Sequence, residues 1–248
     1  MNSASRYSGS YIFVKGRMTA GLTTFADVGA CNIALDQNSL LSTPAKVSVS
    51  SSSANDADGG TGMITATIIG LGPTAQYQEE EITLTGQTAV DSVGTWYRVF
   101  GIVGKTAGSG GTNAGDIYVV KKGTGGTYSG GVPGTFTAVS ALVKAPVGAG
   151  QGLTCFYTTP DSVGSWQVTE LQISGRTQAG TACIQVQDFE NETPSTREFY
   201  VDFPAGFGYQ LDVRPYKITV GRKTDIRVMA LGASAGLVCH AAMAIAGR

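Results

Sequence analysis

The chain has 248 residues, only 14% of them charged, and a formal net charge of −1, whereas an average soluble domain carries about 25% charged residues. It has no basic stretch, which argues against nucleic-acid binding because that binding depends on neutralising phosphates, and its hydrophobic fraction of 42% is too high for a disordered chain. No apolar run is long enough for a membrane helix, no basic segment leads into an apolar one as in a secretory signal peptide, and a single histidine cannot supply a two-histidine metal site.

The shortage of charge bears on how the surface can be used. Serine, threonine, glycine and alanine take the place of charged residues, and a hydroxyl costs far less to bury than a charge. Such a surface favours a chain that packs against copies of itself or against other subunits. An ordinary all-β secreted domain can have the same composition, so composition alone leaves both interpretations open.

Most of the chain has the pattern of short β-strands. Apolar and polar residues alternate in Thr224–Leu231 and Ala182–Gln187, a period of two that is typical of half-buried strands. Further strands are predicted at Tyr11–Lys15, Ala45–Ser51, Met63–Gly70, Glu80–Leu84, Trp96–Val103, Asp116–Lys121, Thr135–Lys144, Gly152–Thr158, Trp166–Ser174, Arg197–Phe203, Lys217–Val220 and Leu237–Ile245. Glycine-rich turns separate them and no long helix is predicted, so we expect an all-β fold of sandwiches or barrels.

Three regions are expected along the chain. Residues 1–45 form an extended N-terminal arm, residues 46–134 a first β-sandwich domain, and residues 135–248 a second β-sandwich domain that is jelly-roll-like. The boundary at 134 is placed after Gly123–Gly134, the stretch densest in glycine. A short internal repeat, Asp91–Trp96 and Asp161–Trp166, would fit either two related sandwiches or a common turn chemistry.

Residues that could carry catalysis are few. His240 lies next to Cys239, and neighbours in a strand point to opposite faces, which argues against a Cys–His dyad and favours a packed or capping histidine. Glu79 and Glu81 share one face of a strand and could act as paired carboxylates, although a solvated strand edge is favoured. We therefore expect no enzymatic activity, no catalytic residue and no cofactor.

Metal and nucleotide motifs are also weak. Asn55–Gly59 has the oxygen ligands of a calcium loop but lacks its bidentate glutamate, so an Asx-rich turn is favoured and no metal is expected. Gly104-Lys105-Thr106 lacks the glycine-rich approach of a phosphate-binding loop. The four cysteines have no zinc spacing, and buried thiols are favoured over disulfides; they are Cys31, Cys155, Cys183 and Cys239.

Several segments, in order along the chain, carry a resemblance to known proteins. They are Phe25–Gly29, Val47–Ser53 with the following Asn55–Gly60, Glu81–Val90, Tyr97–Phe100, Asn113–Val119, Gly148–Leu153, Tyr157–Pro160, Val213–Ile218 and Lys223–Arg227. Together they resemble a family of tailed-bacteriophage virion proteins common in aquatic phages, which includes capsid-decoration, head-fibre and tail-associated β-sandwich proteins. The resemblance departs at Pro160–Gly164 and does not reach the first 24 residues. It implies a structural component of the particle and transfers no catalytic residue.

We therefore expect a non-enzymatic structural subunit of a bacteriophage particle, made in the host cytoplasm and located in the virion, most simply as a capsid-associated decoration or cement protein. Its partners would be copies of itself, with a trimer assumed, and other virion subunits such as the major capsid protein. Tyr11, Ile12, Phe13 and Val14 would anchor the arm on a neighbour's sheet edge. Phe203, Phe207 and Tyr209 would form an aromatic contact, unless their loop packs on its own domain.

The sequence leaves two other functions open. One is a tail, baseplate or fibre component, including a host-binding adhesin, which should show exposed aromatic side chains beside polar groups. The other is a carbohydrate-binding or carbohydrate-active β-sandwich module, which as an enzyme needs paired carboxylates at a fixed separation.

Overall fold

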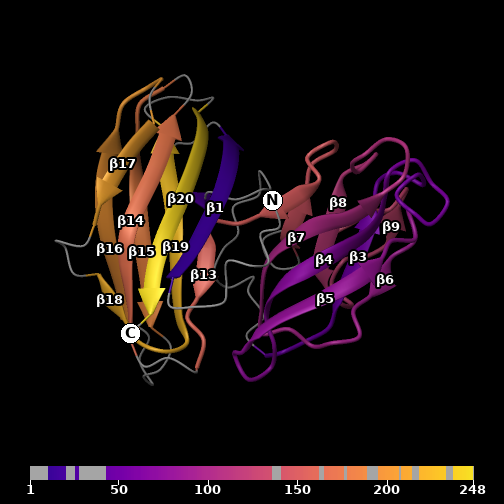
Figure 1. Cartoon of the computed structure of the whole chain (residues 1–248), viewed down its shortest axis with the longest axis horizontal. Coiled ribbons are helices and arrows are strands. Elements are labelled where there is room, and N and C mark those ends of the chain that lie inside the picture. Colours follow the sequence, from indigo (N-terminus) through magenta and orange to yellow (C-terminus); the bar gives the residue numbers. More distant parts are fainter. Residues whose placement is uncertain are drawn as a thin grey trace. The chain divides into compact units, whose positions relative to one another are not determined.

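The structure is a computed structural model that describes residues 11–20, 26–27, 43–135, 141–161, 165–175, 178–188, 195–206, 208–213, 218–232 and 237–247. The regular elements among these residues are β-strands, and the paired strands run antiparallel, which confirms the all-β fold class (Figure 1). The described part of the chain holds no helix capable of spanning a membrane. The chain divides into a discontinuous unit, Met1–Asn32 with Thr154–Arg248, and an inserted unit, Ile33–Leu153.

The inserted unit is a sandwich of two sheets. Their strand orders are β11-β8-β3-β6 and β12-β7-β4-β5. The strands are β3 (Val47–Ser51), β4 (Met63–Leu71), β5 (Tyr77–Thr83), β6 (Val90–Asp91), β7 (Arg98–Ala107), β8 (Ile117–Lys121), β11 (Ala141–Ala145) and β12 (Gln151–Leu153), with a small hairpin of β9 (Tyr128–Ser129) and β10 (Val132–Pro133). Both sheets contribute to one core, in which Val49, Ile117, Ile68, Ile102 and Trp96 are almost fully buried. Burial of such side chains contributes about 1.5–3 kcal/mol each.

The discontinuous unit is also built from two sheets. Their orders are β1-β20-β14-β17, with β18 also paired to β14, and β13-β19-β15-β16, with β2 also paired to β19. The strands are β1 (Tyr11–Ala20), β2 (Ala26–Asp27), β13 (Phe156–Thr158), β14 (Trp166–Gly175), β15 (Gly180–Asp188), β16 (Ser195–Phe203), β17 (Gly208–Asp212), β18 (Thr219–Val220), β19 (Thr224–Gly232) and β20 (Leu237–Gly247). In β14, buried residues such as Leu171 and Ile173 alternate with less buried ones, as expected for a half-buried strand. In β15 and β19 the alternating residues Ile184 and Val228 are buried, but so are Cys183 and Met229 on the other face, so these two strands are buried on both faces.

The strand order of the discontinuous unit is that of a jelly roll. If the two-residue strands β2 and β18 are left out, its described strands number one to eight along the chain, and the sheets have the orders 1-8-3-6 and 2-7-4-5. This is the arrangement of the eight-stranded jelly roll, a fold of viral capsid and lectin domains. The prediction of a jelly-roll-like domain near the C-terminus is therefore supported by topology, with β1 as an additional and necessary member.

The inserted unit has the same order in permuted form. Its sheets would also have the jelly-roll orders 1-8-3-6 and 2-7-4-5 if β11 and β12 came before β3 in the described chain. The repeat Asp91–Trp96 and Asp161–Trp166 does not mark a shared strand position. In the permuted numbering it leads into the seventh strand, β7, of the inserted unit, whereas it leads into the third strand, β14, of the discontinuous unit. What the two copies share is local: each aspartate pairs with a lysine, Lys122 or Lys223, at 2.7 and 2.9 Å.

The observed division of the chain differs from the expected regions in two places. First, the expected arm contains β1, which pairs with β20 of the same chain over ten residues. Second, β11 and β12 belong to the inserted unit and not to the second domain. The glycines of Gly123–Gly134 support the β9–β10 hairpin, where Gly131 has a φ of 78°. They do not form a joint between domains.

The boundary between the units falls inside a predicted strand. Gly152–Thr158 reads as one apolar run, but β12 pairs with β7 in the inserted unit while β13 pairs with β19 in the discontinuous unit. The sequence is similarly apolar on both sides of the boundary. The apolar pattern therefore predicts that both strands are buried, but it does not show that β12 belongs to the inserted unit and β13 to the discontinuous unit.

Candidate functional site

The predicted anchor residues lie in an internal strand pair. Tyr11, Ile12, Phe13 and Val14 are in β1, where the register places them opposite Ala246, Ile245, Ala244 and Met243 of β20. The strand expected to add to a neighbour's sheet is thus a member of its own sheet. Within the described residues β1 ends the order β1-β20-β14-β17, so its other edge is the side on which a further strand could pair.

The predicted aromatic contact is divided by the structure. Phe203, at the end of β16, is only 2% exposed, and its ring covers Gly180, where an added Cβ would lie 2.7 Å from the ring atom Cζ. This favours the interpretation in which Phe203 packs on its own domain. Tyr209 lies in β17 opposite Ile173, and Phe207 lies outside the described residues.

Four loops meet at one end of the inserted unit, and we call this surface the four-loop end. It consists of residues 52–62, 84–89, 108–116 and 146–150, which connect β3 to β4, β5 to β6, β7 to β8 and β11 to β12. The loops come from well-separated parts of the chain. Three polar side chains, Asp56, Asn113 and Asp116, hold them together.

Asp56 is fully buried and its carboxylate is satisfied by the protein itself. Oδ1 accepts hydrogen bonds from the backbone N–H of Met63 (2.7 Å) and Ala114 (2.8 Å), and Oδ2 from the N–H of Gly115 (2.9 Å) and the hydroxyl of Ser51 (2.5 Å). Its backbone oxygen accepts from Gly86 N–H at 2.7 Å. One residue therefore connects three of the four loops, through charge-assisted bonds of the strong kind.

The same geometry bears on the candidate calcium loop Asn55–Gly59. Each oxygen of the buried Asp56 carboxylate already accepts two hydrogen bonds, which occupy the positions that a metal ion would need. The described residues contain no cluster of three or more histidine, cysteine, aspartate or glutamate side chains able to hold a metal ion. The turn interpretation of this segment fits the structure.

Asn113 and Asp116 attach the fourth loop. The side-chain amide of Asn113 donates to Pro146 O at 2.8 Å, and its Oδ1 accepts from Gly150 N–H at 2.8 Å. Asp116 accepts from Val147 N–H at 2.8 Å and pairs with Lys144 at 2.7 Å. Although burial acts in the opposite direction, the hydrogen bonds and the charge of Lys144 hold the pKa of Asp116 below its ordinary value.

The four-loop end consists mostly of small residues and is nearly uncharged. Its loops contain no lysine, arginine or aromatic residue, and Asp58 is the one charged residue in them that is exposed. Val147 projects at its rim with 62% of its surface exposed. The tightness of the loops depends on glycine: Gly86 has a φ of 67°, and an added Cβ there would lie 3.0 Å from Ala54.

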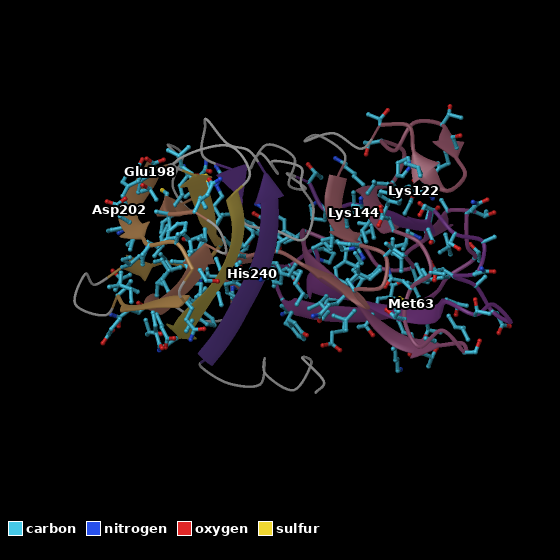
Figure 2. The ribbon with its side chains drawn as sticks, turned by 90° about the horizontal axis from the view of Figure 1, so that it is seen from above. Met63, Lys122, Lys144, Glu198, Asp202 and His240 are labelled. Atoms are coloured by element: carbon cyan, nitrogen blue, oxygen red, sulfur yellow. The ribbon has the colours of Figure 1, made fainter. Side chains whose placement is uncertain are left out.

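A second polar cluster lies on the discontinuous unit, across β19, β15 and β16. The guanidinium of Arg227 donates to Gln185 Oε1, and the Gln185 amide donates to Glu198 Oε1, each at 2.7 Å. Tyr200 donates its hydroxyl to the other oxygen of Glu198 while remaining 57% exposed. This bond lowers the pKa of Glu198 and raises that of Tyr200 to about 12. Figure 2 shows Glu198 and Asp202 on the same side of the unit.

The remaining candidate residues are not brought together as a catalytic group. Glu79 and Glu81 lie on the edge strand β5. Glu79 accepts a hydrogen bond from the hydroxyl of Tyr77, and Glu81 forms an ion pair with Lys105 of β7, as the solvated-edge interpretation predicts. Glu80, on the other face, accepts from Val93 N–H at 2.6 Å and Gly94 N–H at 2.9 Å, which fixes the turn between β6 and β7. His240 is exposed in β20 and faces Ser174 and Arg17 in the register.

The described thiols are expected to resist labelling. Cys155 and Cys183 are buried and form no disulfide. Burial raises the pKa of Cys183 to about 11, so almost none of this thiol is a reactive thiolate at neutral pH. A maleimide followed by peptide mass spectrometry should modify these two residues only after denaturation. Modification of either one in the native protein within minutes would contradict the described burial.

Comparison with known proteins does not assign the chain to a family. No protein-family model and no curated protein matches it. Two solved structures align along most of its length: a T13 IBDV viral particle, with 8% identity over 95% of this chain and 69% of the other at a TM-score of 0.24, and the infectious bursal disease virus VP2 subviral particle, with 13% identity over 96% and 71% at a TM-score of 0.21. At these scores the class of the chain, an all-β protein with a jelly-roll strand order, rests on its own topology.

Proposed function

We propose that the chain is a non-enzymatic structural subunit of a bacteriophage particle and that it decorates or cements the capsid. The observation that carries the proposal is the strand order of the discontinuous unit, because the jelly roll is a fold of viral capsid and lectin domains. A fold alone does not define a function. The resemblance of nine ordered segments to phage virion proteins, and a surface poor in charge, favour the particle over the lectin.

The mechanism in this proposal is contact between preformed surfaces. The low charge allows a large area to be buried at little desolvation cost, and buried apolar area contributes about 25 cal/mol per Å². Because β1 already pairs with β20, the contacts do not need an arm that folds on binding. The edge of β1 that pairs with no described strand could, like the loop ends of the sandwiches, contact neighbouring subunits.

A second function, host binding from a tail or fibre, is favoured by one observation. Tyr200 is exposed beside Glu198, Gln185 and Arg227, and the hydrogen bonds among these side chains hold them in place. Sugar and peptide ligands are recognised by such combinations of an aromatic ring and fixed polar groups.

Counting and locating the chain in purified particles distinguishes the two functions. Quantitative mass spectrometry should give a copy number comparable with that of the major capsid protein, and electron microscopy with an antibody to the chain should mark the head. A copy number comparable with that of tail fibres would favour the second function. Absence of the chain from particles that are otherwise complete would overturn both.

A further inference from the structure

We propose that the four-loop end of the inserted unit is a surface through which two copies of this chain bind each other. This proposal goes beyond the proposed function, because it assigns a surface for self-association that can be tested with the purified chain in the absence of phage particles. It is carried by the arrangement of Asp56, Asn113 and Asp116 beneath a nearly uncharged surface.

The first argument is rigidity. Asp56, Asn113 and Asp116 bind backbone groups of all four loops, at 2.7 to 2.9 Å. Gly108 and Gly110 N–H add bonds from the third loop to the first, each at 2.7 Å. A surface that is already ordered loses little conformational entropy when it binds. A turn can be stable through its own local hydrogen bonds, so the bonds between separate loops add order to the surface as a whole.

The second argument is charge, and it decides the class of partner. A self-contact brings like surfaces together, so a strongly charged patch would repel its copy, whereas this end carries Asp58 as the one exposed charge. The same composition offers nothing to nucleic acid or to an acidic partner. The loops also contain no aromatic ring on which a sugar could stack.

The third argument is the exposed valine at the rim. Val147 keeps 62% of its surface exposed while its N–H is held by Asp116, so the apolar side chain is fixed in position without being buried. Its small neighbours Pro146, Gly148 and Ala149 are also exposed. Close approach of a second copy would bury this group.

A matched control lies at the opposite end of the same unit. Val93 is 85% exposed and its N–H is likewise held by a carboxylate, that of Glu80. Tyr97 N–H donates to Leu71 O at the far end of β4, whose first residue Met63 borders the four-loop end. The nine residues of β4 separate the two ends by about 25 Å.

The test compares V147K and N55K with V93K in the full chain, by sedimentation velocity across about two decades of concentration. We expect the unaltered chain to self-associate. V147K and N55K should raise the dissociation constant by on the order of a hundredfold or more, because each brings a lysine from both copies into the contact, whereas V93K should leave it unchanged. Thermal unfolding of the three variants should coincide with that of the unaltered chain, since the changed side chains are exposed.

Three results would overturn the proposal. In the first, the unaltered chain is monomeric at every concentration. In the second, V147K and N55K associate as strongly as the unaltered chain, and in the third, V93K weakens association as much as V147K does. If the chain is monomeric but V147K no longer joins particles, the four-loop end contacts another virion subunit and not a second copy. Self-association of a chain that is absent from particles would support this inference while overturning the proposed function.

Discussion

Replacing Asp56 by asparagine is expected to destabilise the inserted unit by about 3–5 kcal/mol. The carboxylate accepts four hydrogen bonds in a fully buried position, and D56N puts an NH₂ group where two of the donors point. At least one backbone N–H then stays buried without an acceptor. A domain has only about 5–15 kcal/mol of net stability, so the loss would remove much of it.

The two tryptophans allow each unit to be followed separately. Trp96 lies in the inserted unit and Trp166 in the discontinuous unit, both almost fully buried. Urea unfolding of D56N in a W166F background therefore reports the inserted unit through Trp96 fluorescence, and W166F alone is the reference. D58N, two positions away and exposed, is the matched control and should change stability by less than about 0.5 kcal/mol. A loss below about 1 kcal/mol in D56N would contradict the assigned role of Asp56.

Deleting residues 1–20 is expected to unfold the discontinuous unit while leaving the inserted unit folded. The deletion removes β1, which pairs with β20 over ten residues. It leaves that edge of β20 unpaired beside the core residues Met243 and Ile245, which are fully buried. If this segment were a free arm, the deletion would instead give a folded protein that no longer joins particles.

The measurement uses the same tryptophan probes. Trp166 fluorescence in a W96F background should lose its cooperative unfolding transition after the deletion, whereas Trp96 in a W166F background should keep its own. Deletion of residues 1–10, which leaves β1 whole, separates the contribution of the strand from that of the preceding segment. A cooperative Trp166 transition that survives removal of residues 1–20 would restore the free-arm interpretation.

The fold could be predicted from the sequence as far as local pattern extends. Alternation in Thr224–Leu231 and Ala182–Gln187 predicts the strands β19 and β15, but the half-burial that it implies is wrong, because Asp225 and Cys183 on the expected outer face are also buried. The partner of a strand is a long-range property, and nothing in Tyr11–Lys15 indicates that its neighbour is the last strand of the chain. The prediction of a single strand at Gly152–Thr158 is wrong for the same reason, because its two halves pair with strands of different units.

The candidate site could be predicted only in part. Glu79 and Glu81 were predicted as a solvated edge because alternation fixes their face. Asp56 lay within a recognised turn motif, yet its role depends on Ala114 and Gly115, 58 and 59 positions later. Asn113 and Asp116 gave no signal beyond polar residues in a glycine-rich loop. The exposed Tyr200 was missed because its strand, Arg197–Phe203, shows the alternation of an ordinary half-buried strand.

The pairing of β1 with β20 has a consequence for synthesis on the ribosome. Leu237 follows Ala20 by 217 positions, so at about 5–20 residues per second the first strand waits roughly ten to forty seconds for its partner. The inserted unit, complete by Leu153, can fold during that interval. The nascent segment Tyr11–Ala20 meanwhile has neither edge paired with β20, and unpaired strand edges are sites of aggregation that a chaperone can shield.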